Sequence, residues 1–165
     1  MMFKVGILSD THLMGPDAGF SRLAHRCFAD CQIIIHAGDL TDIAVLQAFA
    51  EKKIYAVHGN MCNRTSCGSL PGKRIFQLGE FSIGLTHGAG LGLDIESSLW
   101  NLFPEADCMI YGHTHRPVCH HTAGKLIINP GSFQATGRYG APGTYAILEV
   151  GETLKAVLHE VPILS

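Results

Sequence analysis

Charged side chains are scarce in this sequence, at 16% of 165 residues, where roughly 25% is usual for a globular domain. The few charges nearly balance, leaving a net charge of −2. This excludes the broad basic surface that neutralises many phosphates of a long nucleic acid, so we expect no extended nucleic-acid surface. Hydrophobic residues reach 47%. We therefore expect a fold with a large core and no disordered tail.

Long apolar runs are also missing. No stretch approaches the roughly 18 residues that a membrane-spanning helix needs. The N-terminus enters a short apolar segment without the basic region and cleavage site of a signal peptide. We expect no membrane partner and a cytoplasmic location. The length of 165 residues suits one domain with a real core, which we place at 1–165.

The cysteines include no C-x-x-C pair, which argues against a zinc ribbon. Several of the six lie in apolar segments, so we expect buried, reduced thiols rather than disulfides. They are Cys27, Cys31, Cys62, Cys67, Cys108 and Cys119. The excess in this composition is histidine, with ten residues.

Short apolar strands follow one another along the chain. In the first half, strands at 3–8, 33–37 and 53–57 alternate with helical patterns at 21–29 and 42–51. This order predicts a parallel sheet with right-handed crossovers. The second half predicts a helix, a strand and three hairpins, at 94–102, 108–111, 74–85, 118–129 and 144–161. We expect the α/β class, as a four-layer αββα sandwich with two mixed β-sheets flanked by helices.

Polar side chains able to bind metal follow the ends of these strands. They are two carboxylates, four imidazoles and one carboxamide: Asp10, His12, Asp39, Asn60, His87, His113 and His115. In an extended backbone, residues two apart point the same way, so each of the pairs 10/12 and 113/115 can face one point. Ligands bind at the carboxyl edge of α/β sheets, where residues distant in sequence converge. For His36, which lies within a strand, a buried and hydrogen-bonded imidazole fits better than a metal ligand.

Seven ligands of mixed nitrogen and oxygen type exceed the four to six that one such ion takes. The set therefore indicates a dinuclear centre with a carboxylate between the ions. Nitrogen and oxygen ligands together suit Mn²⁺, Ni²⁺, Fe, Co²⁺ or Zn²⁺ better than Ca²⁺ or Mg²⁺. We expect two divalent transition-metal ions, with Mn²⁺ the foremost choice. Such a centre hydrolyses phosphoesters through a hydroxide that bridges the metals.

The ordered motifs bring the sequence close to a known family. Asp10-x-His12, Gly38-Asp39, Gly59-Asn60, His87-Gly88 and Gly112-His113-Thr114-His115 resemble those of the calcineurin-like metallophosphoesterase superfamily. The segment Asn129-Pro130-Gly131-Ser132 is most similar to its compact YfcE-like phosphodiesterase branch. The resemblance covers nearly the whole chain and implies the αββα sandwich.

The resemblance also implies which residue holds which ion. One ion would be held by Asp10, His12, Asp39 and His115, and the other by Asp39, Asn60, His87 and His113. Asp39 would bridge the two, and Asp39, Asn60 and His113 would be the catalytic residues. The implied activity is hydrolysis of a small phosphodiester substrate.

Other functions stay open at this point. A phosphomonoesterase or a nuclease could use the same metals, because these ligands recognise phosphate and not the group attached to it. A non-catalytic interaction scaffold resembling vacuolar protein sorting 29 has the same small fold. Its site departs from the full ligand set, whereas every position matches here, which favours an enzyme. The sequence leaves open whether the chain forms a homo-oligomer.

The sequence departs from the family directly after Asn60. Many members place there a histidine that assists the leaving group, followed by an acid. Met61 and Cys62 occupy these two positions. Met61 cannot donate a proton, and we expect Cys62 to be a loop thiol without a role. The proton donor is therefore unassigned, and we expect substrates whose leaving group departs readily.

Overall fold

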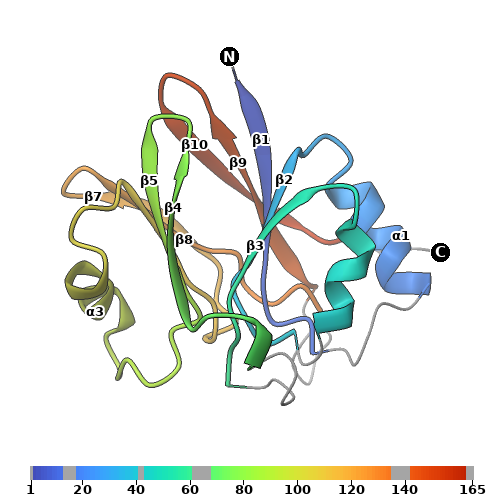
Figure 1. Cartoon of the computed structure of the whole chain (residues 1–165), viewed down its shortest axis with the longest axis horizontal. Coiled ribbons are helices and arrows are strands. Elements are labelled where there is room, and N and C mark those ends of the chain that lie inside the picture. The colour runs from blue at the N-terminus through green and yellow to red at the C-terminus, as the bar shows by residue number, and fades with distance from the viewer. Residues whose placement is uncertain (1, 13–17, 41–42, 61–67, 135–141, 163–165) are drawn as a thin grey trace.

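Two five-stranded sheets face each other in a computed structural model of the chain (Figure 1), which describes residues 2–12, 18–40, 43–60, 68–134 and 142–162. The first sheet has the order β10-β9-β1-β2-β3, formed by Leu154–Glu160, Thr144–Val150, Phe3–Leu8, Ile33–His36 and Lys53–Ala56. The second has the order β4-β5-β6-β8-β7, formed by Lys73–Leu78, Phe81–Thr86, Cys108–Ile110, Lys125–Asn129 and Val118–Thr122.

Successive side chains of a strand pack in different hydrophobic cores. On β1, Val5 and Ile7 point into the core between the sheets, whereas Leu8 belongs to a core on the outer face. On β6, Cys108 lies between the sheets and Met109 lies in a third core on the opposite outer face. This alternation follows from the period of two in a β-strand.

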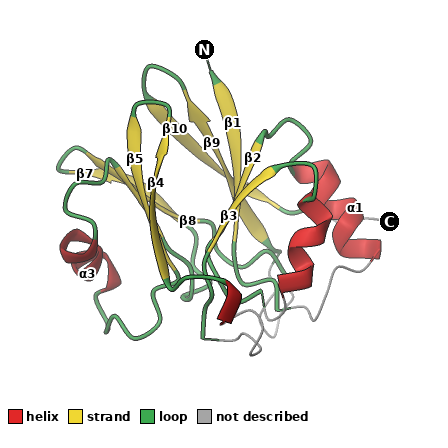
Figure 2. Ribbon diagram, viewed as in Figure 1, coloured by secondary structure: helices red, strands yellow, loops and turns green. Residues whose placement is uncertain are grey.

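Helices cover the two outer faces (Figure 2). The helix α1 (Ala18–Cys27) and the 3-10 helix η1 (Ile43–Phe49) lie on the first sheet, and α3 (Ile95–Leu102) lies on the second. The predicted four-layer αββα sandwich is therefore confirmed. Among the described helices, none is long and apolar enough to cross a membrane.

Two helical predictions need correction. The segment predicted as a helix over 42–51 is the 3-10 helix η1, and its end is wound by bonds of i to i−3 type from Ala50 N to Gln47 O and from Lys52 N to Phe49 O. A 3-10 helix is common in short connections, and here η1 is followed closely by β3. The first helix begins at Ala18 rather than residue 21, because the buried Phe20 extends its apolar face.

The cysteine prediction holds where the structure describes the chain. Cys27, Cys31, Cys108 and Cys119 are free thiols, and Cys31 and Cys108 are buried. Cys62 and Cys67 lie outside the described residues, as does Met61.

Candidate metal centre

The predicted ligands lie at one edge of the sandwich, where strands of both sheets end. β1 pairs in parallel with β2, and β5 pairs in parallel with β6, so their carboxyl ends meet at this edge. Backbone hydrogen bonds tie the following loops together, from Asp10 N to Gly38 O at 2.9 Å and from His12 N to Asp39 O at 2.9 Å. In the second sheet, Gly112 N donates to His87 O at 2.9 Å.

The backbone of this edge is strained. Six non-glycine residues of the described chain have a positive φ, and five of them are predicted ligands: Asp10, His12, Asp39, His113 and His115, with φ between 51° and 70°. A left-handed conformation costs a non-glycine residue roughly 1–2 kcal/mol. Such strain is retained where the surrounding structure fixes it and gathers at functional sites. The sixth residue is Ala123, in the turn between β7 and β8.

Glycines precede several ligands because neighbouring side chains pack closely against the backbone there. Gly38 has φ 99°, and a Cβ on it would lie 2.6 Å from Nδ1 of His87. A Cβ on Gly112 would collide with Oγ of Ser9. The glycine before a ligand, seen in the sequence motifs, is therefore a packing requirement.

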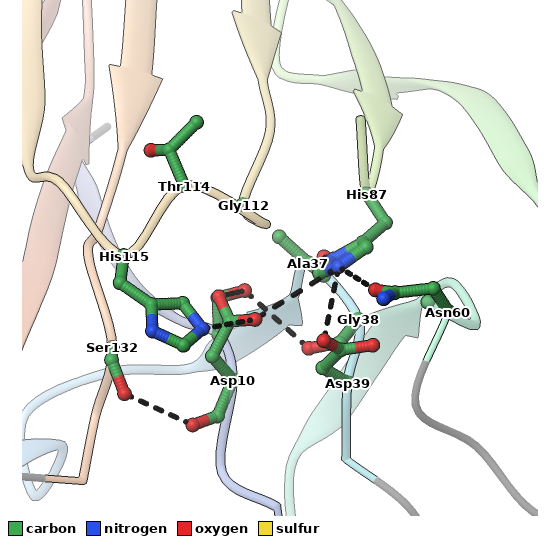
Figure 3. A network of polar contacts seen from close by, with 12 residues as sticks. Asp10, Ala37, Gly38, Asp39, Asn60, His87, Gly112, Thr114, His115 and Ser132 are labelled. Atoms are coloured by element: carbon green, nitrogen blue, oxygen red, sulfur yellow. Dashed lines mark hydrogen bonds and ion pairs between the residues drawn. The ribbon is translucent and has the colours of Figure 1, made fainter. Parts of the chain in front are cut away.

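The side chains converge on two carboxylates (Figure 3). Oδ1 of Asp10 lies 3.3 Å from Nε2 of His115 and 3.9 Å from Nε2 of His87. Oδ2 of Asp39 lies 3.3 Å from Nε2 of His87. His12 stands between the carboxylates, with its Nε2 3.8 Å from Asp10 and 3.9 Å from Asp39.

These side chains form two groups that could each hold a metal ion. The groups are Asp10, His12 and His115, and Asp10, Asp39 and His87, with the ligand atoms of each group within 4.8 Å of one another. Asp10 belongs to both, and the Asp39 carboxylate lies near an imidazole of each group.

The fit to a cation rests on two unsatisfied atoms. Oδ1 of Asp10 and Nε2 of His12 are buried and have no hydrogen-bond partner among the described residues. Buried polar atoms are normally paired, and a carboxylate oxygen next to an imidazole nitrogen is a donor set that divalent transition metals accept. The residues present therefore fit a metal centre.

Asn60 and His113 lie at the margin of this cluster. The Asn60 amide lies 3.0 Å from Nε2 of His87, and in one of its two orientations its nitrogen donates to both Asp39 oxygens, at 3.1 and 3.0 Å. The ring of His113 is 5.2 Å from that of His87, edge to face, outside the two groups. The structure thus brings six predicted ligands into polar contact and places the seventh beside them.

The electrostatics of the cluster also favour a cation. Burial raises the pKa of Asp10, against the opposing effects of the Ser9 hydrogen bond and of His87 and His115. Burial alone would lower the pKa of His87, but the hydrogen bond and the charge of Asp39 outweigh it and raise the pKa. Two buried carboxylates close together need positive charge, from a proton on an imidazole or from a metal.

Sequence reasoning missed residues that hold the ligands in place. Oγ of Ser9 donates to Oδ2 of Asp10 at 2.6 Å. Oγ of Ser132 donates to the Asp10 carbonyl at 3.2 Å (Figure 3). Asn129 Nδ2 donates to Gly112 O at 3.1 Å and to Thr114 Oγ1 at 3.0 Å. In the sequence, Asn129 and Ser132 stood out only as part of the segment 129–132, which resembles one branch of the family. That resemblance assigned no role to either residue.

His36 is the buried, hydrogen-bonded imidazole that the sequence indicated. Its Nδ1 accepts from Gly38 N at 3.1 Å, and its Nε2 lies 3.2 Å from Thr11 Oγ1. Burial first, and then the nearby charge of His87, lower its pKa from 6.5 to about 3, so the ring is neutral. His36 therefore supports the loops that carry Asp10 and Asp39.

Comparison with known proteins agrees with this geometry. Residues 3–153 match the family described as the calcineurin-like phosphoesterase superfamily domain. A probable metallophosphoesterase of Methanothermobacter thermautotrophicus is 32% identical over 155 residues, which cover 92% of this chain and 89% of that protein. The phosphodiesterase MJ0936 of Methanocaldococcus jannaschii is 30% identical over 146 residues, covering 78% and 82%.

Solved structures of more distant sequence share this fold. Vps29 of Chaetomium thermophilum superimposes with a TM-score of 0.73 at 18% identity, over 97% of this chain and 98% of that one. At that identity the likeness establishes the fold alone. The family match and the archaeal relatives decide the family: the chain belongs to the calcineurin-like phosphoesterase superfamily.

Proposed function

We propose that this phosphoesterase hydrolyses phosphodiesters with two divalent transition-metal ions at the strand-end cluster. The observation that carries the proposal is the buried Oδ1 of Asp10, which lacks a hydrogen-bond partner among the described residues and belongs to two adjoining ligand groups. One metal ion would occupy only one of these ligand groups. Two adjoining groups can hold two ions next to each other. Mn²⁺ is the foremost choice, with Ni²⁺, Fe, Co²⁺ and Zn²⁺ as alternatives.

The ligand assignment follows the two sides of the cluster. Asp10, His12, Asp39 and His115 would hold one ion, and Asp39, Asn60, His87 and His113 would hold the other. In support, the Asp39 carboxylate lies within 3.9 Å of His12 and 3.3 Å of His87, which belong to opposite sides. Asp39 also lies nearer to His87 than Asp10 does, at 3.3 Å against 3.9 Å, so we propose Asp39 rather than Asp10 as the bridging residue.

Two such ions, when bound, supply polarisation of the phosphoryl oxygens and a water acidic enough to ionise near neutral pH. The chain supplies the rest. Its two buried carboxylates concentrate negative charge that binds the cations, and the hydrogen bonds of Ser9 and Ser132 fix the orientation of Asp10. His113, half-buried at the margin, would contact an oxygen of the substrate in this proposal.

The preference for diesters rests on two observations. The relative MJ0936 is named a phosphodiesterase, at 30% identity. Met61 stands where related phosphatases place a histidine, so no side chain at that position gives the leaving group a proton. The catalytic residues proposed are Asp39, Asn60 and His113. Location in the cytoplasm and a single domain over 1–165 stay predictions from the sequence, which leaves open whether the chain forms a homo-oligomer.

A metal-dependent hydrolysis screen tests the proposal. The protein is stripped with chelator, reloaded with each metal in turn, and assayed against 4-nitrophenyl phosphate, bis(4-nitrophenyl) phosphate and cyclic phosphodiesters. We expect activity only with metal, and higher kcat/KM for diesters than for the monoester. Asp39→Asn should abolish hydrolysis with the fold intact, whereas the exposed Asp30→Asn should leave it unchanged. Full activity in metal-loaded Asp39→Asn, or a preference for monoesters, would overturn the proposal.

A further inference from the structure

An open pocket of about 470 Å³ adjoins the candidate metal centre. His113 is part of its lining, and the ring of His113 lies 5.2 Å from that of His87, so the pocket borders the centre at this residue. Its other walls include Leu93, Ile95, Tyr111, Arg116 and Val118, and we call it the His113 pocket. No residue of it other than His113 is among the predicted metal ligands.

Leu93 at its rim is fully exposed to solvent. The other large exposed apolar side chains of the described chain are Met2, Ile75 and Val157, and none of them lines a pocket that contains a candidate ligand. The loop that carries Leu93 is fixed on both sides. Ser98 Oγ donates to Leu91 O at 3.0 Å, and Asp94 caps α3 by accepting from Ser97 Oγ at 2.6 Å.

The aromatic ring of Tyr111 lines the pocket and is held by a hydrogen bond. Tyr111 is buried, and its hydroxyl donates to Oε2 of Glu96 at 3.2 Å. The other oxygen of Glu96 lies 2.7 Å from Nε2 of His120. The acid beside the pocket is therefore already paired, and the ring face of Tyr111 stays fixed.

Arg116 provides the charge of this pocket. Its backbone N–H donates to Thr114 Oγ1 at 3.1 Å, and Thr114 is held in turn by Asn129. Its guanidinium makes no hydrogen bond or ion pair with the described residues. A planar cation next to apolar side chains stacks on an aromatic face, an arrangement that an ammonium group or a neutral side chain reproduces less well.

We propose that the His113 pocket binds the ester arm of the phosphodiester that is not the leaving group, and that this arm carries an aromatic ring. The inference rests on the proposed phosphodiesterase function. Size supports a ring, because a cavity of roughly 150 Å³ is enough for benzene and a methyl group would leave most of this pocket empty. A charged arm would instead have to lose water against the side chains of Leu93, Ile95 and Val118.

Two substrates with the same leaving group test the proposal, namely phenyl 4-nitrophenyl phosphate and methyl 4-nitrophenyl phosphate. We expect the wild type to favour the phenyl ester by roughly tenfold or more in kcat/KM, the usual worth of a well-filled apolar contact. Leu93→Ser and Arg116→Gln should each lose several-fold of this preference and keep their rate on the methyl ester. Ile75→Ser is the matched control, because Ile75 is an exposed apolar residue on β4 outside this pocket.

The comparison across variants cancels the intrinsic reactivity of the two esters, since every enzyme sees the same pair. Unchanged ratios in both pocket variants would overturn the inference while hydrolysis itself still supported the phosphodiesterase function. A preference for a carboxymethyl arm that Arg116→Gln removes would also overturn it, because the pocket would then select a second anion.

A binding measurement separates the pocket from the chemistry. Phenylphosphonate and methylphosphonate are titrated calorimetrically into the metal-saturated protein. Tighter binding of phenylphosphonate, reduced by Leu93→Ser and not by Ile75→Ser, supports the pocket even if neither ester is hydrolysed, in which case only the phosphodiesterase function fails. Equal affinities for the two phosphonates would overturn the pocket.

Discussion

Burial changes the acid–base chemistry of His36. This residue is fully buried, and its neutral ring accepts a hydrogen bond from Gly38 N, next to Asp39. Burial, followed by the charge of His87, lowers its pKa from 6.5 to about 3. Protonation would convert the acceptor Nδ1 into a donor facing another donor, so the loop tolerates only the neutral form.

This depressed pKa predicts a pH-dependent stability. Between pH 6.5 and about pH 3 the unfolded chain binds a proton at His36 and the folded chain does not. The free energy of unfolding should therefore fall as the pH falls through this window, by up to roughly 1.4 kcal/mol per pH unit from this group. His36→Asn keeps an acceptor for Gly38 N and should flatten this dependence.

The measurement is urea unfolding at pH 6.5, 5.5 and 4.5 in the presence of chelator, for both proteins. Other titrating groups, Asp10 and His87 among them, contribute equally to the wild type and the variant, so the difference between the slopes reports His36. Equal slopes would show that folding does not lower the pKa of His36.

Met61 governs a second prediction at this scale, made from the sequence because residue 61 lies outside the described residues. Without a proton donor there, the departing oxygen carries more charge in the transition state, and a poor leaving group is penalised most. We expect a steep fall of kcat/KM with leaving-group pKa across aryl phosphodiesters. Met61→His should make it shallower and recover part of the ~10²–10⁴-fold that a general acid contributes.

Met61→Leu serves as the control, since leucine has a similar volume and no titrating group. It should keep the steep dependence of the wild type. A flat dependence in the wild type, with hydrolysis itself rate-limiting, would mean that another residue supplies the proton.

Among the elements, the strands were the most predictable. The strands β1 and β5 could be located from apolar runs that end at a polar side chain, and parallel pairing then placed those ends at one edge. The winding of η1 could not be predicted, because a helical apolar pattern does not distinguish seven residues of 3-10 helix from an α-helix. The supporting hydrogen bonds of Ser132 and Asn129 join residues that only the folded chain brings together.

The connection between β8 and the loop after β6 gives an element-scale prediction. Asn129, fully buried at the end of β8, holds Gly112 and Thr114 on either side of His113. Asn129→Ala removes both bonds, so the strained loop should relax. We expect metal affinity to fall roughly 10- to 100-fold, the usual effect of losing a residue that orients metal ligands.

Titration calorimetry with Mn²⁺ measures this effect directly and does not depend on a substrate. Asn101→Ala, an exposed substitution of the same kind in α3, should bind metal as the wild type does. If Asn129→Ala matched Asn101→Ala in affinity, the bonds from β8 would have no part in placing the ligands.

On the scale of the whole molecule, the candidate metal centre joins the two sheets. Asp10, His12, Asp39 and Asn60 follow strands of the first sheet, and His87, His113 and His115 follow strands of the second. Both metal-binding groups combine the sheets, because Asp10 meets His115 in one and His87 in the other. Ions bound there would link the halves of the sandwich at an edge where carboxylates otherwise repel.

Metal should therefore stabilise the whole molecule, and in two steps. A ligand at 100 times its Kd adds about 2.7 kcal/mol to the free energy of unfolding, which for a domain of this size raises Tm by roughly 5–10 °C per ion. We expect elemental analysis to reach two Mn²⁺ per chain, with chelator reversing the gain in Tm. His87→Ala should bind one ion and keep about half of the gain, because the group of Asp10, His12 and His115 stays complete. The exposed His121→Ala should retain both ions. A wild-type plateau at one ion, with the full rise in Tm already reached there, would replace the dinuclear centre by a mononuclear one.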